Sequence, residues 1–90
     1  MTEAHACTLS GSTLFVEERL ADAEVESLCR LLSSMSRDST VTVELSRARS
    51  VAPHALVRLQ QEVVRHARFG HRVLLRGLTM AQARLLELAR

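Results

Sequence analysis

Apolar residues recur with the period of an α-helix in three stretches of the chain, residues 22–36, 54–69 and 79–90. In the first two stretches they fall on a single face, as expected for helices that pack on a core. These faces consist of Val25, Leu28, Leu32, Met35, Leu56, Leu59, Val63 and Ala67. Asp22 is a suitable N-cap for the first helix, and Gly70 can take the left-handed conformation that ends the second. The pattern predicts three helices.

The third helix has its own start signal and a wider apolar surface. Thr79 and Gln82 have the S/T-x-x-E/Q spacing of a capping box. Its apolar positions cover more than one narrow stripe; they are Met80, Ala83, Leu85, Leu86, Leu88 and Ala89. A wide apolar surface can mark an interface, here through Met80, Leu85 and Leu88. A homodimer through this helix is therefore an alternative to simple core packing.

The remaining segments carry the signals of β-strands. Residues 41–45 ("VTVEL") alternate large apolar side chains with other residues, and residues 72–77 ("RVLLRG") form a second short apolar run. Residues 5–10 and 13–19 are two further strand-like segments that flank Gly11, which indicates a hairpin. The predicted order along the chain is β-β-α-β-α-β-α.

This order defines the expected fold class. Strands that alternate with helices imply parallel neighbours joined by right-handed crossovers, and the hairpin adds one antiparallel pair. We predict an α/β fold, a small mixed β-sheet of about four strands packed with helices. The 90 residues suffice for one domain, which we place at residues 6–90 after a disordered N-terminus of residues 1–5.

Composition narrows the class of partner. The net charge is +2 and every fixed cation is Arg, interspersed with Glu; Phe15 and Phe69 are the only Phe, Tyr or Trp residues. Modules that stack nucleic-acid bases need aromatic rings and a basic stripe, so we predict no nucleic-acid partner. No apolar run approaches the roughly 20 residues of a membrane span, and the N-terminus lacks a secretion signal. We expect a cytoplasmic protein without direct membrane insertion.

Cysteine and histidine do not show the spacing of a metal site. Cys7 and Cys29 lie far apart in apolar settings, which is typical of buried free thiols. His5 and Cys7 form one loose pair, whereas structural zinc sites use tightly spaced pairs of ligands. His66 and His71 do not complete such a pattern. We predict no metal and no cofactor.

Three segments together resemble the STAS family, named for sulfate transporters and anti-sigma factor antagonists. The segment "VTVELS" resembles the family's "VVLDLSGV" strand, "GHRVLLRGL" its later strand and "ARLLELAR" its last helix. The likeness covers roughly residues 6–90 and rests on pattern and order rather than on an invariant motif. It implies a single STAS-like domain.

The sequence departs from that family at its switch. Aligning Glu44 with the family's strand Asp puts Ala52-Pro53-His54-Ala55 over the family's Asp-Ser-Ser-Gly. In anti-sigma factor antagonists a Ser of that motif is phosphorylated by the anti-sigma kinase, which switches partner binding off. Here His54 occupies the degenerate phosphoacceptor position, and the nearest hydroxyls are those of Ser46 and Ser50. The resemblance therefore implies a docking surface without the usual switch, unless Ser50 inherits it.

The resemblance implies a non-enzymatic, stand-alone protein-interaction module of bacterial transcription regulation, which docks to an anti-sigma kinase-like partner. The expected partner-binding residues are Ser46, Arg47, Arg49, Ser50, Pro53, His54, Leu56 and Arg58. Arg47 and Arg49 flank a helix N-terminus, so an anion site is a second interpretation of these two residues.

Two other functions remain as alternatives. STAS-like subunits also accompany the ATPases of ABC-type lipid transport systems, and such a chain would bind an ABC ATPase-like partner. A small enzyme using His54 would need a buried pocket with a carboxylate beside the imidazole, for which Glu44 is the nearby candidate in sequence.

Overall fold

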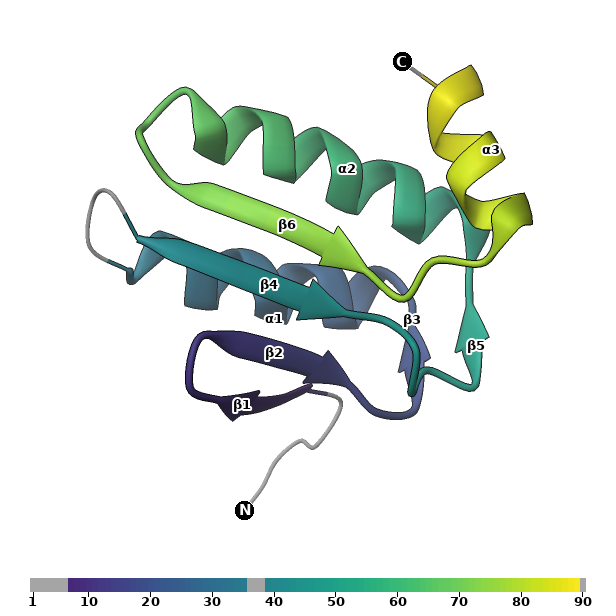
Figure 1. Ribbon diagram of the computed structural model, residues 1–90, viewed down its shortest axis with the longest axis horizontal. Helices are drawn as coiled ribbons and strands as arrows, with labels where there is room; N and C mark the ends of the chain where they lie inside the picture. The colour runs from purple at the N-terminus through teal and green to yellow at the C-terminus, as the bar shows by residue number, and fades with distance from the viewer. Residues whose placement is uncertain (1–6, 36–38, 90) are drawn as a thin grey trace.

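The computed structural model describes residues 7–35 and 39–89 (Figure 1). Its elements are β1 (Cys7–Ser10), β2 (Thr13–Val16), β3 (Arg19–Leu20), α1 (Asp22–Ser33), β4 (Thr40–Glu44), β5 (Ser50–Val51), α2 (Pro53–Ala67), β6 (Arg72–Arg76) and α3 (Met80–Leu88). The predicted domain boundary after residue 5 lies outside the described residues.

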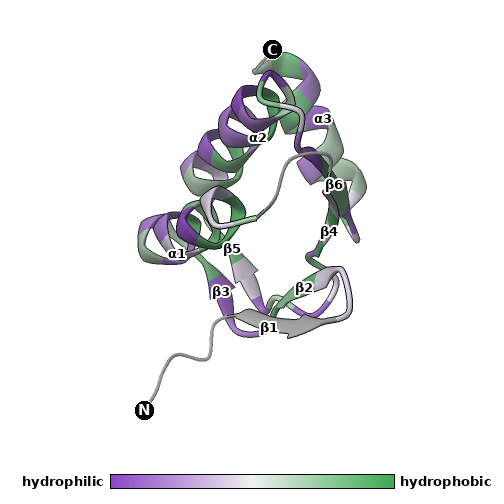
Figure 2. Ribbon diagram, turned by 90° about the vertical axis from the view of Figure 1, so that its left-hand side faces the viewer, coloured by the Kyte–Doolittle hydropathy of each residue, from purple (hydrophilic) through white to green (hydrophobic). Residues whose placement is uncertain are grey.

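Four strands form the main sheet in the order β1-β2-β4-β6. β1 and β2 pair antiparallel across the turn at Gly11, which has φ 62°, and the pairs β2–β4 and β4–β6 are parallel. Both α1 and α2 lie on the same face of this sheet, and α3 lies beside α2 (Figure 2). The predicted class, a single α/β domain with a small mixed sheet, is confirmed.

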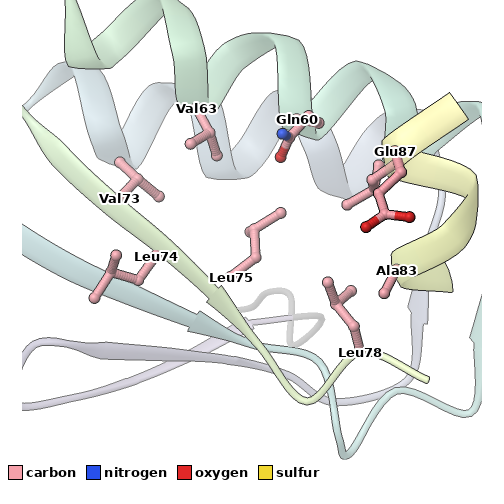
Figure 3. Close-up of a pocket in the computed structure, with 9 residues that line it drawn as sticks. Gln60, Val63, Val73, Leu74, Leu75, Leu78, Ala83 and Glu87 are labelled. Carbon is pink, nitrogen blue, oxygen red and sulfur yellow. The ribbon is translucent and has the colours of Figure 1, made fainter. Parts of the chain in front are cut away.

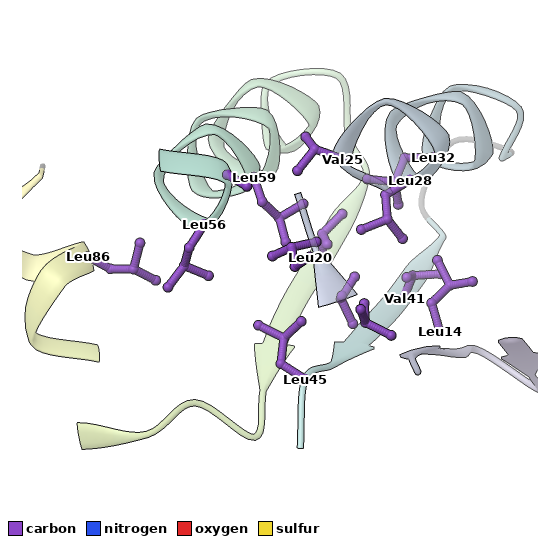
Figure 4. Close-up of a cluster of buried hydrophobic side chains, with 14 residues drawn as sticks. Leu14, Leu20, Val25, Leu28, Leu32, Val41, Leu45, Leu56, Leu59 and Leu86 are labelled. Carbon is purple, nitrogen blue, oxygen red and sulfur yellow. The ribbon is translucent and has the colours of Figure 1, made fainter. Parts of the chain in front are cut away.

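The core fills the space between the sheet and the two long helices. Val41 and Val43 of β4 and Leu45, the residue after it, alternate with half-buried or exposed neighbours, so these three side chains point toward the helices. Figure 4 shows Leu56 of α2 extending toward Leu86 of α3. The other buried apolar residues are Leu14, Val16, Leu20, Val25, Leu28, Leu32, Ala55, Leu59 and Val73. Without aromatic rings, the core is built from Leu, Val and Ala.

Helix ends follow the sequence signals with one correction. Thr79 caps α3 as predicted, since its Oγ1 accepts from the Gln82 amide at 3.1 Å while Gln82 Oε1 accepts from the Thr79 amide at 2.9 Å. The N-cap of α1 is Ala21, not Asp22. The carboxylate of Glu24 accepts from the Ala21 amide at 3.0 Å, so this carboxylate satisfies the free donor and leaves Asp22 in the first turn.

The predicted strand over residues 13–19 ends at Val16, and two very short strands were not predicted as separate elements. β3 and β5 pair parallel to form a separate two-stranded sheet, with Arg19 opposite Ser50 and Leu20 opposite Val51. Strands of two residues are too short to show an alternating pattern. Among the described residues, no helix has both the length and the apolar character that a membrane crossing needs.

Candidate functional site

The starts of α1 and α2 meet at the edge of the main sheet where its parallel strands end. In α/β sheets this edge is the usual place for binding sites, because the connecting loops leave the strands there. The loop from β4 to α2 runs across this edge and is held by β3. The Glu18 carbonyl accepts from the Arg49 amide at 2.7 Å, and the Leu20 carbonyl accepts from the Ala52 amide at 2.9 Å. These bonds fix the first turn of α2 next to the start of α1.

Four ionisable side chains link the two helix starts. Asp22 Oδ2 lies 3.4 Å from His54 Nε2, and Asp22 Oδ1 lies 3.5 Å from Arg58 Nη1. Arg58 Nη2 lies 3.7 Å from Glu26 Oε2. We call Asp22, Glu26, His54 and Arg58 the helix-start cluster. Asp22, Glu26 and His54 are well exposed and Arg58 is partly exposed, so each of these contacts contributes about 0–1 kcal/mol and the cluster shapes a surface rather than holding the fold together.

Arg47 is oriented by two contacts. Its Nη1 lies 3.2 Å from Glu17 Oε2, and its guanidinium carbon lies 4.1 Å from the centroid of the Phe15 ring. A carboxylate and an aromatic face already engage this cation. Arg47 is thus less suited to a free anion than the sequence alone indicates.

The structure gathers most of the predicted partner-binding residues at this edge. The exposed ones are Ser46, Arg47, Arg49, Ser50, Pro53 and His54, and Arg58 is partly exposed. Leu56 is the exception, because its side chain has 0% exposure and belongs to the core. Its assignment to the partner surface was wrong, since the inner face of an amphipathic helix turns it toward the sheet.

The structure does not place His54 in the buried pocket that the enzyme hypothesis requires. The side chain of His54 is 69% exposed, and its carboxylate neighbour is Asp22. Glu44 instead lies 4.0 Å from the Arg76 guanidinium. A Cβ on Gly77, which has φ 77°, would overlap the Glu44 carboxylate and the amide nitrogen of Ser46. The structure therefore pairs His54 and Glu44 with different residues, and His54 lies in no buried environment.

Sequence reasoning missed Asp22 as a member of this cluster, because 32 positions separate it from His54 and its only apparent role was that of an N-cap. A topological signal was present in the predicted β-α-β-α order. Right-handed crossovers over one face of a parallel sheet place successive helix starts at the same edge.

Two histidines, His66 and His71, lie close together at the other end of α2. His66 Nδ1 faces His71 Nδ1 at 3.3 Å, and His66 Nε2 lies 3.9 Å from Glu62 Oε1. Burial, reinforced by the neighbouring His71, lowers the pKa of His66. Within residues 7–35 and 39–89, no group of three or more His, Cys, Asp or Glu side chains could hold a metal ion. His5 and the side chain of Cys7 lie outside the described part.

Cys29 is a free thiol, but it is half-buried rather than fully buried as predicted. It lies on the flank of the apolar face of α1. Burial, together with the charge of Glu62, raises the pKa of the Cys29 thiol. The positive charges of Arg58 and Arg65 oppose this shift but are the smaller effects, so the thiolate form that a reactive cysteine needs is disfavoured.

Comparison with known proteins supports the fold and nothing beyond it. No protein-family model and no curated protein matches the chain. A crystal structure of a protein called Mglu matches with a TM-score of 0.58 and 19% identity over 77% of this chain. The match covers 18% of the Mglu chain, so this domain corresponds to a small part of that protein.

Proposed function

We propose that this chain is a non-enzymatic interaction module of the cytoplasm that docks a regulatory protein, of the anti-sigma kinase-like class, through the edge where α1 and α2 begin. The docking surface consists of the helix-start cluster (Asp22, Glu26, His54 and Arg58) together with Ser46, Arg47, Arg49, Ser50 and Pro53. We call it the helix-start surface. The observation that carries the proposal is that these side chains are exposed, or partly exposed for Arg58, on a backbone held by β3–β5 pairing.

A fixed surface of this kind suits recognition rather than catalysis. The backbone bonds from Glu18 and Leu20 order the loop before a partner arrives, which lowers the entropy cost of binding. Exposed and mutually paired charges favour a complementary polar partner surface, since complementarity supplies specificity and speeds encounter. An exposed His54 without a buried pocket gives no preorganised environment for chemistry.

Regulation differs from that of the family which the sequence resembles. A hydroxyl is absent at position 54, so a serine kinase has no target there. The imidazole of His54 is already paired with Asp22, so added negative charge at this position would face a carboxylate. We propose that docking is constitutive at this position, with Ser50 as the nearest exposed hydroxyl on the surface.

The test is affinity purification of the wild-type chain from its native host, beside His54→Asp and the control Arg68→Asp. His54→Asp places a second carboxylate next to Asp22 on the proposed surface, whereas Arg68 is exposed near the far end of α2. We expect an anti-sigma kinase with wild type and the control, and its loss with His54→Asp. Recovery of an ABC ATPase and permease would support the alternative function, and equal recovery by all three chains would refute the proposed surface.

A further inference from the structure

Strand β6 ends the main sheet, and its outer edge is not paired within the described residues. On its inner side, the Arg72 amide donates to the Ser39 carbonyl at 2.9 Å and the Arg76 carbonyl accepts from the Leu45 amide at 2.8 Å. Backbone groups of a strand point alternately to its two sides, so the amides and carbonyls of Val73 and Leu75 point outward. This edge can therefore accept hydrogen bonds from, and donate them to, another strand.

An apolar cleft runs along this edge. It lies between β6, α2 and α3, has a volume of about 290 Å³ and is lined by Val63, Val73, Leu75, Leu78, Ala83 and Leu86. Leu74 also borders it, although its side chain points away from that of Leu75 (Figure 3). Gln60 and Glu87 add polar groups to its lining. Side chains of an added strand that point toward the helices would enter this cleft, whereas those that point the other way would lie on the uncovered face of the sheet.

The face of β6 that no helix covers carries two positive charges, which bear on the kind of strand that could pair with it. Arg72 and Arg76 are exposed on either side of Leu74, which is 47% exposed. Alternation places all three on the same face, opposite to that of Val73 and Leu75. A strand paired with β6 would meet positive charge at both ends and an apolar side chain in the middle.

A second copy of this chain does not match that pattern. Antiparallel pairing of two β6 strands over all five residues would be centred on Leu74 and would place Arg72 of each copy opposite Arg76 of the other. Like charges directly opposite each other destabilise a strand pair. Arginines at the ends of an edge strand thus oppose self-association, which is a common use of charge at sheet edges.

We propose that the β6 edge and its cleft bind an extended segment of a partner protein by strand addition. The segment has the pattern acidic–apolar–apolar–apolar–acidic. Its acidic side chains pair with Arg72 and Arg76, its central side chain covers Leu74, and the two between them enter the cleft. The carboxylate of Glu44, 4.0 Å from Arg76, partly offsets that cation, so Arg72 is the stronger of the two charge contacts. This surface is separate from the helix-start surface and does not rest on it.

The test uses the full chain, labelled with ¹⁵N, and a synthetic peptide Glu-Val-Leu-Val-Glu with blocked ends. Nuclear magnetic resonance would follow the amides during titration and during exchange with deuterium. We expect chemical-shift changes centred on Val73 and Leu75, and slower exchange of these two amides in the bound state. A peptide with Lys in place of both Glu residues should bind at least about tenfold more weakly, because two attractive pairs become repulsive.

Variants separate the charge contact from the fold. Arg72→Glu should weaken binding of the acidic peptide about tenfold and favour the Lys peptide, whereas Arg68→Glu, outside the cleft, should change neither. Dispersed spectra would confirm that both variants fold. Equal binding of the two peptides, or shifts at the helix-start surface instead of β6, would overturn the proposal. Concentration-dependent protection of Val73 and Leu75 without peptide would show that the occupant is a second copy, which would also overturn it.

Discussion

Replacing Leu56 with Ala should destabilise the fold strongly, whereas replacing the neighbouring His54 with Ala should not. Leu56 has 0% exposure and packs inside the cluster that joins α2, the sheet and α3 (Figure 4). Removing three heavy atoms from such a site costs about 2–5 kcal/mol, which combines lost burial and the cavity left behind. The free energy of unfolding of a small domain is about 5–15 kcal/mol, so this loss is a large fraction of the total.

The same reasoning gives a small effect at His54. Its contact with Asp22 is exposed, and even a fully charged surface pair contributes only about 0–1 kcal/mol. Denaturation by urea, followed by circular dichroism, measures both variants against wild type. For a domain of this size, the Leu56→Ala loss corresponds to a fall in Tm of at least about 8 °C. A loss below about 1 kcal/mol, with an unchanged urea slope, would refute the assignment of Leu56 to the core.

Three further outcomes follow from other parts of the molecule. Burial lowers the pKa of His66, so below about pH 6.5 the unfolded chain binds more protons than the folded one. The free energy of unfolding should therefore decrease as the pH is lowered below this value. Urea titrations at several pH values would measure this decrease, and the part due to His66 should be absent in His66→Asn. Gly77→Ala should lower the free energy of unfolding more than Gly11→Ala, since both residues have positive φ but only at Gly77 does a Cβ overlap other atoms. The backbone strain common to both variants is about 1–2 kcal/mol. Equal losses of stability in thermal melts would contradict the overlap at Gly77. The double variant Met80→Ser, Leu88→Ser should change the free energy of unfolding by less than about 0.5 kcal/mol, because these side chains are 85% and 80% exposed. If sedimentation velocity shows a dimer for wild type that the double variant loses, these residues belong to a homodimer interface.

Periodicity predicted the elements that are long enough to show it. The stripes of α1 and α2 and the alternation in β4 identify most of the buried positions, including Leu56, whose own spacing places it in the core. The α2 stripe was wrong at Ala67, which is exposed, and Met35 and Val63 are only half-buried. Resemblance to a docking helix pointed the other way for this residue, and the periodic signal was the more reliable of the two. The pairing of β3 with β5 involves two residues from each segment, so it depends on tertiary contacts that no local pattern records.

The helix-start cluster shows why site chemistry is harder to predict than topology. Strand order alone places the first turns of α1 and α2 at one edge, but it does not show which side chains reach across. Asp22 contacts His54 and Arg58 because α1 begins at Asp22 with Ala21 as its N-cap and Glu24 as the group that satisfies the cap amide. A shift of one residue in the helix start would have turned this carboxylate away.

Hydrogen–deuterium exchange of the purified complex, with the partner recovered from the native host, addresses the docking surface itself. The proposed function predicts that binding slows exchange of the amides in residues 46–58 and at the start of α1, and leaves β6 unchanged unless the partner also supplies an added strand. Two reference samples are compared with the complex: the wild-type chain without partner, and the His54→Asp variant mixed with the same partner. Unchanged exchange across residues 46–58 in a complex of measured stoichiometry would contradict docking at the helix-start surface.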